Sequence, residues 1–245
     1  CSGVSSARAR PICAMFSGGF IPSGSEDPFA LRRMGNGIIR MLLERQIPLS
    51  LPRAVAKSLD LAGQFPTRSF DKAKVQAEVS EFLWSRLESL AVERNFPVDE
   101  VRAVKDGALA NVARAFSRLA AVHALRPEPD FVPLAAAFKR ASNILKQADG
   151  GSSGEVQKDL LREAAEQNLF SALCRVEGEV REKVSQGLYE DGLRTLVALK
   201  PQVDQFFDGV LVMDKDEKVK ANRISLLSRL VRLFKTVADI GTIQN

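Results

Sequence analysis

Residues 131–148 read FVPLAAAFKRASNILKQA, and the spacing of their apolar side chains indicates a class of fold. Apolar residues stand at positions 131, 134, 138, 141, 145 and 148, alternately three and four residues apart. Side chains at this spacing lie on one side of an α-helix. The segment therefore predicts an amphipathic helix that buries a narrow apolar stripe.

Similar spacing recurs on both sides of this segment, whereas no stretch alternates apolar and polar residues as a half-buried strand would. Prolines and glycines divide the chain, with breaks at residues 127–130 and 149–154. We expect helices at 27–46, 53–61, 69–94, 97–104, 109–125, 155–186, 188–199 and 217–239, and a further helix that starts at Pro201. The predicted fold class is all-α, a multi-helix array followed by a C-terminal helical bundle.

The composition limits the chemistry that the chain could perform. Its 245 residues are 45% apolar and 27% charged, as in a globular protein of one or two domains. No apolar run approaches the roughly 20 residues that span a bilayer, so we expect no membrane partner. With one histidine (His123) and three cysteines, a His-based metal site or a catalytic triad is improbable. We predict no catalytic residue, metal or cofactor in this chain. We expect the Cys174 side chain to lie in the core, and the His123 side chain, on an apolar helix, to be buried or half-buried.

The net charge of +5 permits nucleic-acid binding without requiring it, and two helices carry basic residues in patterns that fit this role. On the last expected helix, Lys218, Asn222, Ser225, Arg229 and Arg232 are three or four residues apart and share one face. Arg223 lies beside them, and leucines cover the opposite side. A basic stripe opposite an apolar one suits a phosphate backbone. A solvated face balanced by neighbouring acids is the alternative.

The helix at 131–148 carries the second basic pattern. Lys139, Asn143 and Lys146 lie on one face, with Arg140 beside Lys139. Lysine and arginine neutralise phosphates, while asparagine can hydrogen-bond a base edge or a 2′-hydroxyl. An ordinary solvated face explains the same pattern.

A third pattern lies near the start of the chain. Asp27 and Pro28 are typical of a helix start, since Asp caps and Pro suits the first helical position. The paired Arg32 and Arg33 that follow could bind a phosphate or a partner's carboxylate, although the capped helix start explains the segment almost as well. The glycines at 35 and 37 weaken this helix unless they mark close packing.

Four stretches together resemble a known family. They are IPSGSEDPFALRR at 21–33, KRASNIL at 139–145, VDQFFDGVLVM at 203–213, and ANRISLL at 221–227 running into VADI at 237–240. Their order and spacing over residues 16–243 resemble the C-terminal region of the beta subunit of the heterotetrameric, bacterial-type glycyl-tRNA synthetase.

The resemblance implies three regions. Residues 134–245 would be a DALR-type anticodon-binding domain like that of arginyl-tRNA synthetase, and residues 25–133 a helical linker or body. Residues 1–24 would be the tail of an upstream domain similar to HD phosphohydrolases. Residues 1–15 do not read like the helix expected there, so we interpret them as a remnant of a domain boundary, a gene model or cloning. Residues 1–25 lack acids, as organelle transit peptides do, but a fragment of a longer protein is the simpler explanation.

The resemblance also implies a function. The chain would hold the anticodon arm of tRNA-Gly for ATP-dependent glycylation by a separate alpha subunit, which would carry the ATP and Mg sites, in an alpha2beta2 heterotetramer. The location would be cytoplasmic, with an organelle left open. Because residues 134–245 hold 17 basic and 16 acidic side chains, a tRNA footprint must come from local clustering. The candidate tRNA-binding residues are Lys139, Arg140, Asn143, Lys146, Lys218, Asn222, Arg223, Arg229 and Arg232.

Two alternatives and one ambiguity remain. The chain could be the anticodon module of an arginyl-type synthetase, or a non-catalytic helical scaffold that docks a partner subunit through residues 25–130. Phe206 and Phe207 could serve as stacking platforms for splayed bases, or they could simply pack in the core.

Overall fold

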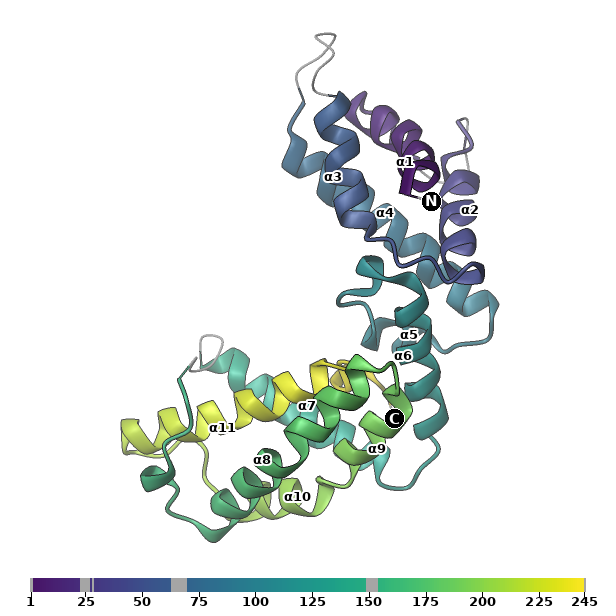
Figure 1. Cartoon of the computed structure of the whole chain (residues 1–245). Helices are drawn as coiled ribbons and strands as arrows, with labels where there is room; N and C mark the ends of the chain where they lie inside the picture. The colour runs from purple at the N-terminus through teal and green to yellow at the C-terminus, as the bar shows by residue number, and fades with distance from the viewer. Residues whose placement is uncertain (1, 23–26, 28, 63–69, 149–153, 245) are drawn as a thin grey trace. The chain divides into compact units, whose positions relative to one another are not determined.

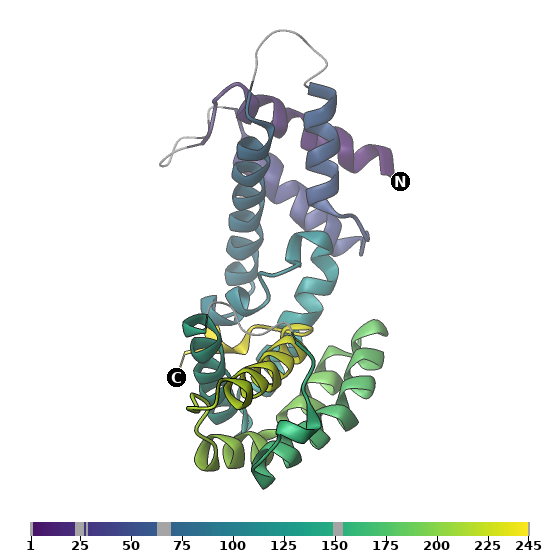
Figure 2. The same ribbon diagram turned by 90° about the vertical axis from the view of Figure 1, so that its left-hand side faces the viewer.

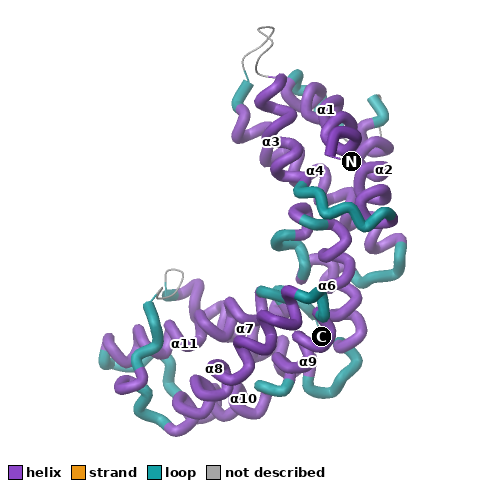
Figure 3. Tube along the Cα trace, viewed as in Figure 1, coloured by secondary structure: helices purple, strands orange, loops and turns teal. Residues whose placement is uncertain are grey.

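A computed structural model describes residues 2–22, 27, 29–62, 70–148 and 154–244. All regular elements in these ranges are helical, which confirms the all-α prediction (Figure 3). The α-helices are α1 (Ser2–Ser17), α2 (Leu31–Glu44), α3 (Leu51–Ala62), α4 (Lys72–Glu93), α5 (Val98–Ala103), α6 (Val112–Leu125), α7 (Phe131–Gln147), α8 (Ala164–Ser185), α9 (Tyr189–Val197), α10 (Lys200–Gly209) and α11 (Glu217–Lys235). Three short 3-10 helices are η1 (Ala108–Ala110), η2 (Lys158–Leu160) and η3 (Ile240–Thr242).

The chain divides into two compact units. The first unit contains residues 1–101 and 105–116, and the second contains residues 102–104 and 117–245. The three predicted regions, with boundaries at 24/25 and 133/134, stay predictions. None of the described helices is long and apolar enough to cross a lipid bilayer.

In the first unit, α1 packs against α2, α3 and α4 (Figures 1 and 2). Its buried side chains are Ala9, Ile12, Cys13 and Phe16. The expectation that residues 1–15 lack the helix is therefore wrong for the described residues 2–15, whereas their interpretation as a remnant stays a prediction. The apolar stripe at positions 9, 12, 13 and 16 has helical spacing, but Pro11 and the early Ser and Gly residues conceal it.

Helix α2 begins three residues later than its predicted start at Pro28, because a turn intervenes. The N–H of Ala30 donates to the carbonyl of Asp27 (2.9 Å), and Ala30 adopts a left-handed conformation (φ 54°). The Asp27 carboxylate still accepts the N–H of Arg32, at 3.1 Å from Oδ2. Asp27 thus holds the helix start, but from outside the first turn.

The two glycines of α2 differ in their surroundings. A Cβ on Gly35 would stand 3.0 Å from Arg86 Cγ and 3.1 Å from Phe82 Cε1 on α4, whereas one on Gly37 would meet nothing within 4 Å. Close packing therefore explains Gly35 and leaves Gly37 unexplained. In α4 itself, Asp71 caps the first turn by accepting the N–H of Lys74, and the predicted start at Ser69 lies outside the described residues.

In the second unit, α11 packs against α7 and α8, and α10 packs against the same two helices (Figure 1). The rings of Phe138 on α7 and Phe234 on α11 lie 5.5 Å apart, centroid to centroid, and both are buried. The leucine side of α11 is buried as predicted. Its regular helix ends at Lys235 rather than at Asp239, and η3 follows.

The helical stretch predicted at 155–186 is confirmed over most of its length, but its start is wrong. Helix α8 begins only at Ala164, where Glu163 and Glu166 form a capping box that fixes the start. Residues 154–157 instead run without helical structure to η2.

His123 and Cys174, expected inside, are exposed, because each faces away from the apolar stripe of its helix.

Candidate nucleic-acid interface

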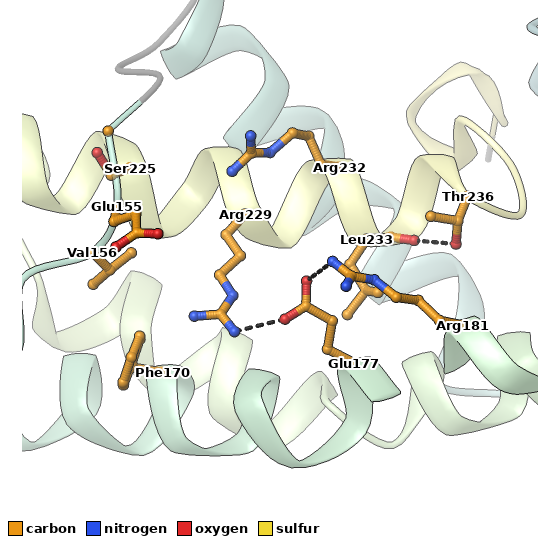
Figure 4. Close-up of a pocket in the computed structure, with 11 residues that line it drawn as sticks. Glu155, Val156, Phe170, Glu177, Arg181, Ser225, Arg229, Arg232, Leu233 and Thr236 are labelled. Atoms are coloured by element: carbon orange, nitrogen blue, oxygen red, sulfur yellow. Dashed lines mark hydrogen bonds and ion pairs between the residues drawn. The ribbon is translucent and has the colours of Figure 1, made fainter. Parts of the chain in front are cut away.

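The predicted basic face of α11 lines two adjoining pockets of the second unit. The larger pocket has a volume of about 620 Å³ and lies between α8, α11 and residues 154–156 (Figure 4). The smaller, of about 390 Å³, lies toward the start of α11. Arg229 and Arg232 line the larger pocket, Lys218 and Asn222 the smaller, and Ser225 both. The structure thus brings the predicted stripe together along one hollowed face.

A strap of residues 154–157 lies along this face and lines the two pockets. Gly154 and Glu155 line both of them. The Asn222 side chain fixes the strap, since its Oδ1 accepts the N–H of Gln157 (2.7 Å) and its Nδ2 donates to the Gln157 carbonyl (3.0 Å). Asn222 is only 4% exposed. Its amide is therefore used within the fold, which argues against the predicted role of Asn222 in reading a base.

Arg223 points away from the predicted face into the interior. Its guanidinium donates to Glu166 (2.6 Å), to Asp214 (2.7 Å) and to the Leu211 carbonyl (2.8 Å). Arg223 is 3% exposed and Glu166 is fully buried. Burial disfavours the charged guanidinium, but the two carboxylates outweigh it and raise the pKa of Arg223. Arg223 joins α8 to α11 and has no access to an RNA phosphate, which corrects its predicted role.

Three arginines line the larger pocket, and two of them pair with one carboxylate. Glu177 accepts from Arg229 through one oxygen and from Arg181 through the other, each at 2.6 Å (Figure 4). The Arg229 guanidinium also lies over the ring of Phe170, 5.3 Å from its centroid. Burial acts against its charge, yet the hydrogen bond that Arg229 donates to Glu177 raises the pKa of Arg229, so it stays cationic. Arg232 is exposed on the pocket wall.

The predicted residues of α7 are all exposed. Lys139, Asn143 and Lys146 reach solvent on one side of the helix, beside Arg140. Since Ala148 and Gly154 are six residues apart, their Cα atoms are separated by at most about 22 Å. The end of α7 therefore lies within about 22 Å of Gly154, which lines the larger pocket.

The two phenylalanines of α10 have different environments. Phe206 is fully buried and packs in the core. Phe207 is half-buried, and the guanidinium of Arg140 covers its ring at 4.6 Å from the centroid. Guanidinium planes stack on bases as aromatic rings do. The outer face of Arg140 is therefore a better candidate stacking platform than the Phe207 ring that it covers.

Sequence reasoning missed Arg181 and Phe170, which α8 contributes to the larger pocket. The signal that could have found Arg181 is its spacing of four from Glu177, which predicts an ion pair on one helix face. That the pair faces α11 depends on contacts between residues distant in sequence. The described residues hold no cluster of three His, Cys, Asp or Glu that could bind a metal ion.

Comparison with known proteins adds family matches to this geometry. Residues 5–106 match the family described as "Glycyl-tRNA synthetase beta subunit", and residues 134–243 match the "DALR anticodon binding domain". The chain belongs to the glycyl-tRNA synthetase beta-subunit family. The first match begins within α1, and it argues against an arginyl-type synthetase.

Curated relatives of this family align along nearly the whole chain. The "Glycine--tRNA ligase beta subunit" of Syntrophotalea carbinolica is 40% identical over 232 residues, which are 95% of this chain and 33% of the relative. The protein of the same description from Geobacter metallireducens gives the same three values. That of Anaeromyxobacter sp. (strain K) is 39% identical over 97% of this chain and 34% of its own length. The chain spans about a third of the length of these relatives.

Proposed function

We propose that this chain is the part of a glycine--tRNA ligase beta subunit that binds the anticodon arm of tRNA-Gly. The observation that carries the proposal is the larger pocket, which Arg181, Arg229 and Arg232 line. All three lie within the residues that match the anticodon-binding domain. Several arginines that line one hollow suit the phosphates of a bent single-stranded loop.

The α7 residues extend the proposed interface. Lys139 and Lys146 supply exposed cations. The exposed amide of Asn143 could hydrogen-bond a base edge, and the guanidinium plane of Arg140 could stack on a base. Lys218 is exposed at the smaller pocket and completes the set. Asn222 and Arg223 do not belong to the proposed interface, since their side chains bond to Gln157 and to Glu166 within the fold.

The role proposed for the chain is positional. Binding one arm of the tRNA orients its acceptor end, which lowers the entropic cost of reaction at a distant active site. We assign ATP, Mg and the ligase chemistry to an alpha subunit, with an alpha2beta2 assembly and a cytoplasmic location as further proposals.

The test is binding of tRNA-Gly to the 245-residue chain over a salt series. Each phosphate contact adds about 0.7–0.9 to the slope of log affinity against log salt concentration. We expect Arg232→Gln and the pair Lys139→Gln with Lys146→Gln to weaken binding and to flatten the slope. Arg175→Gln is the matched control, because Arg175 is exposed on the side of α8 away from Arg181. Absence of salt-dependent binding, or equal losses in the control, would contradict the proposal.

A further inference from the structure

Glu177 occupies the place in the larger pocket where a bound phosphate would be expected. Its two carboxylate oxygens each accept one guanidinium donor, from Arg229 and from Arg181, at 2.6 Å. The unesterified oxygens of an RNA phosphate present the same paired acceptors to arginine. The carboxylate is 19% exposed, and Arg181 is 68% exposed, so solvent reaches the clamp.

The pocket has room for more than this carboxylate. It opens to solvent and has a volume of about 620 Å³, with Arg232 on its wall and Glu155 as its other acid. Figure 4 shows Arg229 and Arg181 directed at Glu177 from opposite sides. Two guanidiniums already directed at one point form a preorganised anion site.

The clamp is not needed to hold α8 against α11. The buried Arg223–Glu166 pair joins the same two helices, and Leu169 and Leu173 of α8 are fully buried. The Arg181 side of the clamp is 68% exposed, and exposed ion pairs contribute little to stability. A carboxylate that contributes little to the fold while occupying two arginines lowers the affinity of the site for other anions.

We propose that Glu177 is a built-in competitor for an RNA backbone phosphate in the pocket between α8 and α11. In the free protein Glu177 keeps Arg229 and Arg181 paired and directed into the pocket. When RNA binds, a phosphate replaces the carboxylate on both guanidiniums. The inference rests on the proposed function, and it adds a residue that tunes affinity without contacting the RNA.

The test is affinity of the 245-residue chain and its Glu177→Gln variant for an RNA stem-loop with the tRNA-Gly anticodon. Glutamine keeps the shape of the side chain and removes its charge, so we expect binding to tighten about threefold to tenfold. Glu179→Gln makes the same change in net charge on the opposite side of α8, where Glu179 pairs with Lys183. We expect this control to change affinity less than twofold.

A double-mutant comparison separates competition from a general charge effect. In an Arg229→Gln background the competitor has lost one of its two partners, so Glu177→Gln should bring little further gain. Thermal unfolding of each variant shows whether the fold is kept.

Three outcomes would overturn the inference. They are weaker or unchanged binding by a folded Glu177→Gln variant, an equal gain in Glu179→Gln, and an undiminished gain in the Arg229→Gln background. Inorganic phosphate binding to Glu177→Gln as tightly as the stem-loop would also contradict the assignment to RNA. If the unsubstituted chain fails to bind the stem-loop, the proposed function fails instead.

Discussion

Replacing Arg223 by methionine tests whether this residue serves the fold rather than RNA. The substitution leaves the fully buried Glu166 without its 2.6 Å partner and removes donors from Asp214 and the Leu211 carbonyl. Removing one member of a buried ion pair costs about 3–5 kcal/mol, against a typical total stability of about 5–15 kcal/mol. For a unit of this size the expected fall in Tm is about 10–20 °C.

Urea and thermal unfolding followed by circular dichroism measure this loss. Arg232→Met, on the exposed wall of the pocket, is the control and should stay within about 0.5 kcal/mol. The double variant Arg223→Met with Glu166→Met should regain most of the stability, because an apolar pair needs no charge compensation. It would still lack the capping bond that the N–H of Glu163 donates to Glu166, worth about 1 kcal/mol. A loss below about 1 kcal/mol in Arg223→Met would refute the reasoning.

Three further predictions concern both units. Gly35→Ala should lose about 1–3 kcal/mol of unfolding free energy through overpacking, whereas Gly37→Ala should be neutral or gain up to about 1 kcal/mol; equal urea midpoints would contradict this. Iodoacetamide near pH 8 should alkylate the exposed Cys174 and spare Cys13, because burial raises the pKa of the Cys13 thiol to about 11; peptide mass spectrometry that finds both equally labelled in the folded chain would disprove it. The hydrogen bond from the N–H of Asp216 holds the pKa of Asp214 below its ordinary value of 3.8; burial opposes this shift and Arg223 assists it. This carboxylate therefore stabilises the fold above about pH 4, and its contribution is lost as the pH falls through the lowered pKa. Asp214→Asn should therefore be less stable at neutral pH and lose less stability on acidification; pH profiles of Tm that run parallel would argue against this.

Helical spacing was enough to predict most of the helices and the exposed residues of α7. Apolar residues three and four apart recur in almost every helix, and the charged residues between them face solvent. Spacing did not predict α1, because Pro11 and the early serines and glycine conceal its pattern. It also misplaced the start of α8, which a capping box fixes. Local sequence carries these signals, but their relative strengths depend on packing.

The candidate site was predictable only in part, because burial on α11 depends on distant residues. Arg223 follows Asn222 directly and looks equally available, yet its partner Glu166 lies 57 residues away in sequence. The strap that Asn222 holds lies 65 residues away. Contacts at such separations leave no trace in local periodicity. The stripe of Arg229 and Arg232 was predictable because it follows from spacing within one helix.

Competition between two tRNAs for the 245-residue chain tests the central claim most directly. One is tRNA-Gly and the other is the same tRNA with a changed anticodon, at one fixed salt concentration. Recognition of the anticodon arm predicts tighter binding of unchanged tRNA-Gly, by about tenfold or more for each base read at about 1.4 kcal/mol. Equal affinity for the two tRNAs would contradict the claim that this chain recognises the anticodon.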